Sequence, residues 1–508
     1  MNGQSPECFE VYITRKGPVL VSGSNRVDIL RSVTGRTMQD GKAVELCYVT
    51  ADTKLPKSSI FSTLEDLVKK GILRYGTVSG KKGYELDSYR ILGTMEPQER
   101  YDNFSKRFTS KELMGYDLYR MNFDYLVAAS LAYGLDISPI MKTLGNDFGK
   151  YILKQSGDAD KALEALIEWY DKVDAADVTV TSRLPVTIEI SFRSDSLTDE
   201  LAKVFSMFVL YSVSAALNGG RGTAIESTEI DGSKVTGRFG HSDSVRDFDL
   251  IPSDFEYDED ADADFMIYIT SFGTFRSVDS RLGMAILDVM PSGVPMSSAD
   301  ITKALEPEDK KPQSSVLFYL EKMIAAGIVE DVRVMNKRKF VKRGGDLYNW
   351  SRDPDLSKTY LPDDYCRNSF ENPSTAYGHI LSALIKRLIN LRIVMESAIG
   401  RLARSLAQQY CDMSEKKTIE SIMNTVMDKG RWLNLSVTSI TSFVPFTFVR
   451  KLGPETDEIL LKTQVLFDTE FFRTVIREIT GVEYASECTP YTSGDNRGYK
   501  LTFNFKSR

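Results

Sequence analysis

Apolar side chains recur at helical spacing in a segment near the N-terminus. Within residues 56–73 they fall at i, i+4, i+7 and i+8, which forms one stripe of an amphipathic helix, made of Ile60, Leu64, Leu67 and Val68. Ser58 and Ser59 precede this stripe at the place where an N-cap belongs. We therefore expect a helix that begins with a serine cap and ends at Gly71.

The flanking residues predict two further helices and a hairpin. Residues 26–33 and 43–53 lie before the third helix and have helical apolar spacing. After it, residues 74–86 alternate between apolar and polar around a tip that contains Lys81 and Lys82, which predicts a two-stranded wing. Three helices followed by a wing is the order of a winged helix-turn-helix.

The same pattern returns in the second half of the chain. Residues 56–73 align without gaps on residues 312–329, at an offset of 256. Two later landmarks follow at offsets of 260 and 261, namely residues 181–188 opposite 441–448, and Gly220 and Glu226 opposite Gly481 and Glu487. Matched landmarks in the same order predict a tandem duplication. The alternative is that two unrelated helical segments share their turn residues.

The second copy ends in a strongly basic wing. Its helices are predicted over 281–290, 297–305 and 312–327, and its wing over 329–343. The wing holds six cations, which are Arg333, Lys337, Arg338, Lys339, Lys342 and Arg343. In a chain of net charge −7, such a cluster indicates an anionic partner, and duplex phosphate fits it. The alternative is a basic tip that only favours solubility.

After each wing, predicted helices are followed by strands, a long apolar helix and two more strands. In the first half the helices cover 116–155 and 158–173, the first strands 178–192, and the apolar helix 203–217. Helices on one face of an antiparallel sheet make an α+β fold. The uncharged stretch Val204–Gly220 is shorter than the roughly 20 apolar residues that cross a bilayer. We therefore expect a buried helix and no membrane association.

The fold class is therefore predicted as α+β, in two repeats that each join a winged helix-turn-helix to an α+β domain. The predicted divisions are winged helix 1 at 1–92, α+β domain 1 at 93–245, an acidic linker with a connecting strand at 246–272, winged helix 2 at 273–352, and α+β domain 2 at 353–508. Seven acidic residues lie between Asp254 and Asp264, and because like charges repel we interpret this segment as a solvated linker. A calcium loop is disfavoured because its central glycine and terminal glutamate are missing.

The residue types argue against catalysis and metal binding. The chain has only two histidines, His241 and His379, and its five cysteines show no CxxC spacing, so histidine triads, zinc sites and a disulfide framework are not expected. No nucleophile, base and orienting group can be assembled, so we predict neither an enzyme nor a cofactor. Few cysteines and an N-terminus without a signal-peptide pattern predict a cytoplasmic protein.

Three groups of residues are candidates for function. The DNA-contacting group is Lys57, Ser58, Ser59, Ser62, Lys81 and Lys82 in the first copy, and Gln313, Ser314, Ser315, Tyr319, Arg333, Lys337, Arg338 and Lys339 in the second. A pocket for a small apolar effector is expected at Phe205, Phe208, Tyr211, Phe467, Phe471 and Phe472, although such aromatic residues are also common in plain core. The redox candidates are Cys366, Cys411 and Cys488, with inert buried thiols as the alternative.

Both winged units resemble the archaeal and bacterial regulators of the ArsR and MarR type. The resemblance rests on the pattern SS(I/V)xxxLExΦΦxxGI(L/V), where Φ is apolar, and covers about 70 residues in each half. The pattern also occurs in winged helices that bind only protein. The resemblance implies a winged-helix fold and DNA binding.

The α+β domains resemble the 4-vinyl reductase-type sensor domain, a small-molecule-binding fold akin to haem nitric-oxide-binding domains. The resemblance is carried by small residues at helix ends (Gly145, Gly149 and Gly400), by the apolar helices before Gly220 and Gly481, and by the last strand pair. A winged helix joined to this domain resembles the methanogen redox regulators of the vinyl-reductase type, here doubled. The cysteine-rich final hairpin of those sensors is nearly absent, since Ser227 stands where the second copy has Cys488 and no second cysteine follows in either copy.

These observations predict a DNA-binding transcriptional regulator whose partner is double-stranded DNA. The alternative is an interaction scaffold whose winged helices dock protein. We expect the apolar helices Val204–Leu217 and Val465–Ile479 to pack on each other about a pseudo-two-fold axis. The chain would then be a pseudo-dimeric monomer with both winged helices on one side, or else a homodimer.

Overall fold

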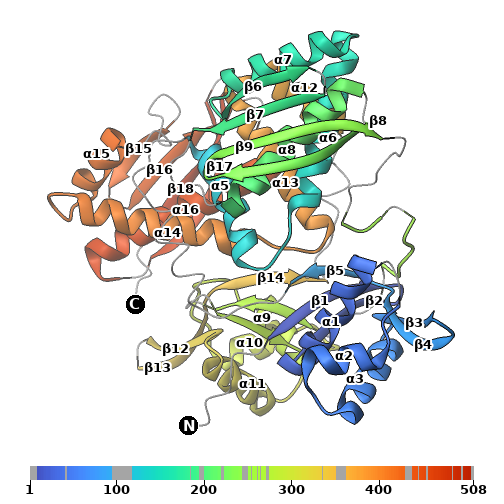
Figure 1. The fold of residues 1–508 in the computed structure, drawn as a ribbon. Coiled ribbons are helices and arrows are strands. Elements are labelled where there is room, and N and C mark those ends of the chain that lie inside the picture. The colour runs from blue at the N-terminus through green and yellow to red at the C-terminus, as the bar shows by residue number, and fades with distance from the viewer. Residues whose placement is uncertain are drawn as a thin grey trace.

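The computed structural model describes residues 8–40, 43–93, 117–183, 185–193, 199–218, 222–242, 250–252, 254–259, 261, 263, 265–270, 274–334, 336–350, 362–429, 438–443, 445–453, 456–482, 484–493 and 496–504. Across these residues the fold mixes α-helices with several antiparallel sheets (Figure 1). Of the predicted α+β domain 1, residues 94–116, Gly220 and residues 243–245 are among those that lie outside this description.

The N-terminal part, called helical unit 1, contains three helices and two small sheets. Its elements are β1 (Phe9–Thr14), β2 (Gly17–Ser22), α1 (Ser24–Asp40), α2 (Leu46–Thr53), α3 (Lys57–Lys69), β3 (Leu73–Val78), β4 (Lys81–Leu86) and β5 (Tyr89–Leu92). One sheet has the order β2-β1-β5 and the other is the β3-β4 hairpin. Val44, between α1 and α2, forms a bridge with Tyr84 of β4 and so adds a third, very short strand to the hairpin.

Helical unit 2 repeats this order of elements. It contains β10 (Met266–Ile269), β11 (Phe275–Val278), α9 (Arg281–Val289), α10 (Ser298–Ala304), α11 (Gln313–Ala325), β12 (Val329–Val334), β13 (Lys337–Lys342) and β14 (Gly345–Asn349). Its three-stranded sheet has the order β11-β10-β14, and Met296 bridges to Phe340 as Val44 does to Tyr84. The leading hairpins of both units were not predicted, and all six residues of β1 are buried, so β1 shows no alternation of buried and exposed positions.

Two larger units, called sheet units 1 and 2, each place helices on a four-stranded antiparallel sheet. Sheet unit 1 contains α5 (Leu118–Ala132), α6 (Ser138–Ser156), α7 (Ala159–Lys172), β6 (Ala176–Arg183), β7 (Val186–Phe192), α8 (Asp199–Asn218), β8 (Gly222–Asp231) and β9 (Lys234–Ser242). Sheet unit 2 contains α12 (Pro362–Glu371), a 3-10 turn (Pro373–Thr375), α13 (Ala376–Asn390), α14 (Glu396–Met413), α15 (Ile419–Lys429), β15 (Thr438–Phe443), β16 (Phe446–Lys451), α16 (Glu458–Thr480), β17 (Ala485–Ser493) and β18 (Asn496–Asn504). Their strand orders, β6-β7-β9-β8 and β15-β16-β18-β17, correspond strand for strand.

Close helix packing explains the small residues of α6. Gly145 and Gly149 lie inside this helix and not at its end, so that expectation was wrong. A Cβ atom on either residue would collide with a backbone carbonyl of α8, at Phe208 and Ser212 respectively. α8 is long and apolar enough to cross a membrane, but 72% of its most apolar stretch is buried inside the protein. The prediction of a buried core helix is confirmed.

The two sheet units meet through equivalent helices. α5 packs on α13, and the contact of α5 with α14 is matched by the contact of α13 with α6, as expected for a pseudo-two-fold axis. Hydrogen bonds cross this interface from Trp169 Nε1 to the Ser369 carbonyl (2.8 Å) and from Gln464 Nε2 to the Tyr119 hydroxyl (2.6 Å). The predicted pairing of Val204–Leu217 with Val465–Ile479 is wrong, because α8 and α16 pack chiefly on α6 and α14 of their own units.

One continuous hydrophobic core joins both sheet units and the inner faces of the two three-stranded sheets. Val11 of β1, Leu92 of β5, Ile267 of β10 and Leu347 of β14 all belong to this core. The helices of each helical unit bury a separate, smaller core. Figure 1 shows both helical units on the same side of the sheet units.

The described acids of the acidic segment are exposed, as expected for a solvated segment, but its aromatic residues pack against the rest of the protein. Ser253, Asp260, Asp262 and Asp264 lie outside the described residues, but Phe255 packs edge-on against Tyr89 (4.8 Å between ring centroids) and Tyr257 lies 6.3 Å from Trp350. The Trp350 Nε1 atom also donates a hydrogen bond to the Ala261 carbonyl (2.7 Å). Apolar residues interleaved with the acids therefore hold this segment against both halves.

Candidate nucleic-acid interface

The third helices begin at proline and not at serine. Pro56 and Pro312 occupy the N-cap positions of α3 and α11, and neither helix has a side-chain cap. The predicted caps Ser58 and Ser59 instead lie in the first turn. Proline is well suited to this place because its fixed φ and missing N–H cost nothing at a helix start.

The predicted DNA-facing side of α3 is exposed. Ile60, Leu64 and Leu67 are buried, whereas the candidates Lys57, Ser58, Ser59 and Ser62 all face solvent. In α11, Gln313 and Ser314 are exposed, and Ser315 and Tyr319 are half-buried. The candidate faces of α3 and α11 are thus largely accessible to a partner.

Sequence reasoning missed two exposed aromatic residues on these faces. Phe61 of α3 is 46% exposed and Phe318 of α11 is 55% exposed. Phe318 lies at the position equivalent to Ser62, so the two faces differ in chemistry. The signal was available, because Phe61 stands off the apolar stripe of its helix.

The wing cations of helical unit 1 are bound by acidic side chains. Lys82 Nζ lies 3.0 Å from Glu65 Oε1 and 3.8 Å from the centre of the Tyr75 ring. Glu65 also accepts hydrogen bonds from the hydroxyls of Tyr75 (2.7 Å) and Tyr84 (2.9 Å). The bonds from Tyr75 and Lys82 lower the pKa of Glu65. Two further cations of the wing are paired as well, Lys81 with Glu45 at 3.9 Å and Arg74 with Glu85 at 2.7 Å.

Helical unit 2 repeats the central contact of this cluster. Arg338 lies at the position equivalent to Lys82, and its Nη1 atom is 2.5 Å from Oε1 of Glu321, which is equivalent to Glu65. Arg338 also lies 3.1 Å from Asp331. In both units, a glutamate of the third helix therefore holds the wing against that helix.

Arg343 pairs with Glu330 and Arg281 with Asp309, both at 2.8 Å, but several exposed cations in the described residues of helical unit 2 form no ion pair with an acid. Among them are Lys310 and Lys311 before α11, Lys322 on α11, and Arg333 and Lys337 on the wing. Lys322 instead lies over the Phe318 ring at 4.5 Å. Lys339 is half-buried and close enough to Asp300 to lower the pKa of that carboxyl, after the larger effect of hydrogen bonds from Ser297. Helical unit 2 thus presents unneutralised positive charge on its wing, which helical unit 1 does not.

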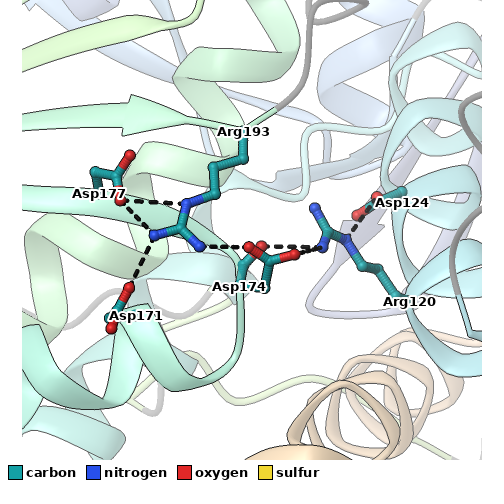
Figure 2. A network of polar contacts seen from close by, with 6 residues as sticks. All are labelled: Arg120, Asp124, Asp171, Asp174, Asp177 and Arg193. Atoms are coloured by element: carbon teal, nitrogen blue, oxygen red, sulfur yellow. Dashed lines mark hydrogen bonds and ion pairs between the residues drawn. The ribbon is translucent and has the colours of Figure 1, made fainter.

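A second polar cluster lies at the edge of sheet unit 1 (Figure 2). Arg193, at the end of β7, contacts Asp171 (2.8 Å) and Asp177, and also reaches Asp174. The Asp174 carbonyl accepts a hydrogen bond from Nη1 of Arg120 (2.9 Å). The hydrogen bonds that Arg193 donates to the aspartates, Asp177 first, raise the pKa of Arg193.

This cluster connects the α7–β6 turn to β7 and to α5. Its four carboxylates outnumber its two guanidinium groups, because Asp124 also lies 3.9 Å from Arg120 Nε. The local charge is therefore negative and disfavours an anionic ligand. We interpret the cluster as a structural clamp on a turn where Asp174 has a positive φ of 54°.

The predicted pocket aromatics pack against other side chains. Phe467, Phe471 and Phe472 are fully buried, and Phe472 lies 4.5 Å from Phe448, ring centre to ring centre. Phe208 packs 5.9 Å from Phe148, and Phe205 and Tyr211 are half-buried. These six residues belong to the packed core of their units, as the alternative reading held.

The environments of the three candidate redox thiols do not favour reactivity. Cys366 and Cys411 are buried, and burial raises both pKa values, that of Cys411 to about 11. Cys488 is exposed, yet desolvation and the charge of Asp468 raise its pKa as well. A sensor thiol requires a lowered pKa next to a cation, so the redox-switch hypothesis loses its physical basis.

Comparison of the chain with family models, curated proteins and solved structures gives no match. The resemblance to winged-helix regulators and to vinyl-reductase-type sensors therefore rests on residue patterns and on the order of elements.

Proposed function

We propose that the protein is a cytoplasmic, DNA-binding transcriptional regulator in which each helical unit is a winged helix-turn-helix. Each unit has three helices, the third exposed along one face, followed by a hairpin that packs on it. Val44 and Met296 extend these hairpins by one bridge each. The repeated order of elements supports a tandem duplication of this unit.

The observation that carries the proposal is the set of exposed cations without acidic partners on helical unit 2. Arg333 and Lys337 on the wing and Lys310, Lys311 and Lys322 around α11 come from both parts of the surface that a winged helix turns to DNA. Phosphate contacts of this kind supply affinity and position the protein, but they do not read sequence. Helical unit 2 is therefore the main phosphate-binding unit in this proposal.

The test compares two equivalent lysines. Lys337 begins β13 without an ion pair, and Lys81 begins β4 beside Glu45. Binding to a random duplex is measured by fluorescence anisotropy over a salt series. Lys337→Ala should reduce the slope of log K against log salt by about 0.9, since one phosphate contact is lost. Lys81→Ala should change the slope by less. Equal, negligible effects of both variants would exclude the wing of helical unit 2 from the interface.

The exposed aromatic residues favour a second candidate function, an interaction scaffold. Phe61 and Tyr75 flank the Lys82–Glu65 pair, and Tyr75 is 50% exposed. Exposed aromatics next to neutralised charge suit a protein surface better than phosphate. A scaffold would bind random duplex DNA weakly and with little dependence on salt.

A further inference from the structure

An apolar cavity lies in sheet unit 2, away from the aromatic residues that were predicted to form a pocket. It has a volume of about 240 Å³ and opens between α13, the turn at residues 391–395, the start of α14, and α16. Leu388, Ile389, Ile393, Ile459 and Leu466 line it, and its lining has no aromatic side chain. The cavity is thus shaped by aliphatic groups.

The size and charge of the cavity define the chemistry of its ligand. A dry apolar cavity of about 150 Å³ holds a benzene molecule, so this one suits a ligand of roughly ten non-hydrogen atoms. Arg392, Lys462 and Glu396 lie at the lining, and Lys462 Nζ is 2.8 Å from Glu458 Oε1. The charges of these two cations are balanced by the charges of Glu396 and Glu458, so the mouth of the cavity offers no net charge to an ionised headgroup.

The first half of the chain has different residues at the equivalent positions. Ser130 and Phe205 correspond to Leu388 and Leu466, at offsets of 258 and 261. Phe205 packs 5.9 Å from Phe123 within its unit. The fold therefore accepts an aromatic residue at the place of Leu466, which provides a conservative way to fill the cavity.

The turn that lines the cavity is bonded to helical unit 2. The backbone N–H of Asn349 donates to the Arg392 carbonyl (3.1 Å), and the backbone N–H of Val394 donates to the Leu347 carbonyl (2.8 Å). The turn therefore lies along β14. The Arg392 guanidinium also covers the Trp350 ring at 5.1 Å. Only two residues separate β14 from β13 of the basic wing, so this turn is bonded to a strand directly next to the wing in the chain.

We propose that this cavity binds an uncharged aliphatic molecule of roughly ten non-hydrogen atoms and that binding changes the position of β14. The binding site does not depend on the proposed function. The effect of the ligand on DNA affinity does rest on it, and couplings between two such sites are typically about 5- to 150-fold.

The experiment uses the full chain and 1-octanol as the probe, with octanoate as its charged counterpart. Isothermal titration calorimetry should detect one saturable site for 1-octanol and at least about tenfold weaker binding of octanoate. Leu466→Phe, or Leu466→Trp if the smaller change leaves space, should remove the site. The control is Leu461→Phe on the same helix, because Leu461 does not line the cavity. Folding of each variant is checked by circular dichroism.

Hydrogen exchange then reports on the coupling. The probe should alter exchange of the amides in residues 345–349 in the wild type and in Leu461→Phe, but not in the filled variants. Absent binding in the wild type, equal binding in the wild type and both filled variants, or tighter binding of octanoate would overturn the proposal. A site that binds 1-octanol in a protein without DNA affinity would support the cavity and refute the proposed function instead.

Discussion

Removal of one acidic side chain should strengthen DNA binding. In the proposed complex, Glu321 on α11 faces the phosphates and neutralises Arg338, from which it is separated by 2.5 Å. The change Glu321→Gln keeps the shape of the side chain and removes its charge. Arg338 then becomes available for a phosphate contact, while Asp331 at 3.1 Å still holds part of it.

The magnitude follows from counterion release. One added phosphate contact steepens the slope of log K against log salt by about 0.9, so the gain of the variant should shrink roughly 3.5-fold when salt rises fourfold. The stability cost is small, because Arg338 and Glu321 are 45% and 52% exposed and such pairs contribute about 0.2–1 kcal/mol. A gain in affinity without a comparable change in unfolding temperature is therefore expected.

The assay is anisotropy with one random duplex between 50 and 200 mM salt, a range in which about 0.9 units of slope are readily measured. The charge-matched control is Glu164→Gln, since Glu164 is exposed on α7 and its loss changes the net charge equally. If Glu321→Gln and Glu164→Gln have the same affinity and slope, α11 does not face DNA and the reasoning is refuted.

Three other outcomes can be measured independently of DNA. Asp468 pairs with buried Arg450 (2.7 and 2.8 Å), and the loss of one partner of such a pair costs about 3–5 kcal/mol. Asp468→Asn should therefore speed amide exchange in β16 and β18 by about two to four orders of magnitude. A change below tenfold would show that the arginine finds other partners. Because the pKa of Glu65 is lowered in the folded protein, its ionised carboxylate stabilises the fold. This stabilisation is complete above pH 4.5, the ordinary pKa of the group, and is lost as pH falls through the lowered pKa of the folded state. Amide exchange in β3 and β4 should therefore rise only in that acid range, and Glu65→Gln should not show this rise. Light scattering at micromolar concentration should give the 57.1 kDa of one chain, because the pseudo-two-fold contact of α5 with α13 is satisfied internally, whereas a stable doubled mass would mean that the halves pair between chains.

Local periodicity predicted much of the fold, because it depends on neighbouring residues. The stripe containing Ile60 and Leu64 gave α3, and the alternation around Lys81 gave its hairpin. The serine caps failed because Pro56 competes for the same position and determines where the helix begins. A periodic pattern thus identifies a helix but does not determine the residue at which the helix begins.

Contacts between distant segments could not be predicted in this way. The acids around Phe255 and Tyr257 indicated a solvated segment, but the rings that receive these side chains, Tyr89 and Trp350, are remote in sequence. The same limit applies to the surface charges. The six wing cations were visible in the sequence, whereas the binding of Arg338 by Glu321 depends on how the wing folds back on α11.

In the proposed tandem duplication, the fusion of two copies in one chain removes a constraint that every homodimer obeys. A homodimer must present each side chain twice, so a change that helps one site is imposed on the other. Here the halves already differ in their cores, where Arg450 stands at the place of the buried Ile190, and on their third helices, where Phe318 stands at the place of Ser62. In the proposed regulator, each half can thus acquire its own specificity by single substitutions, and the DNA target has no need to be a palindrome.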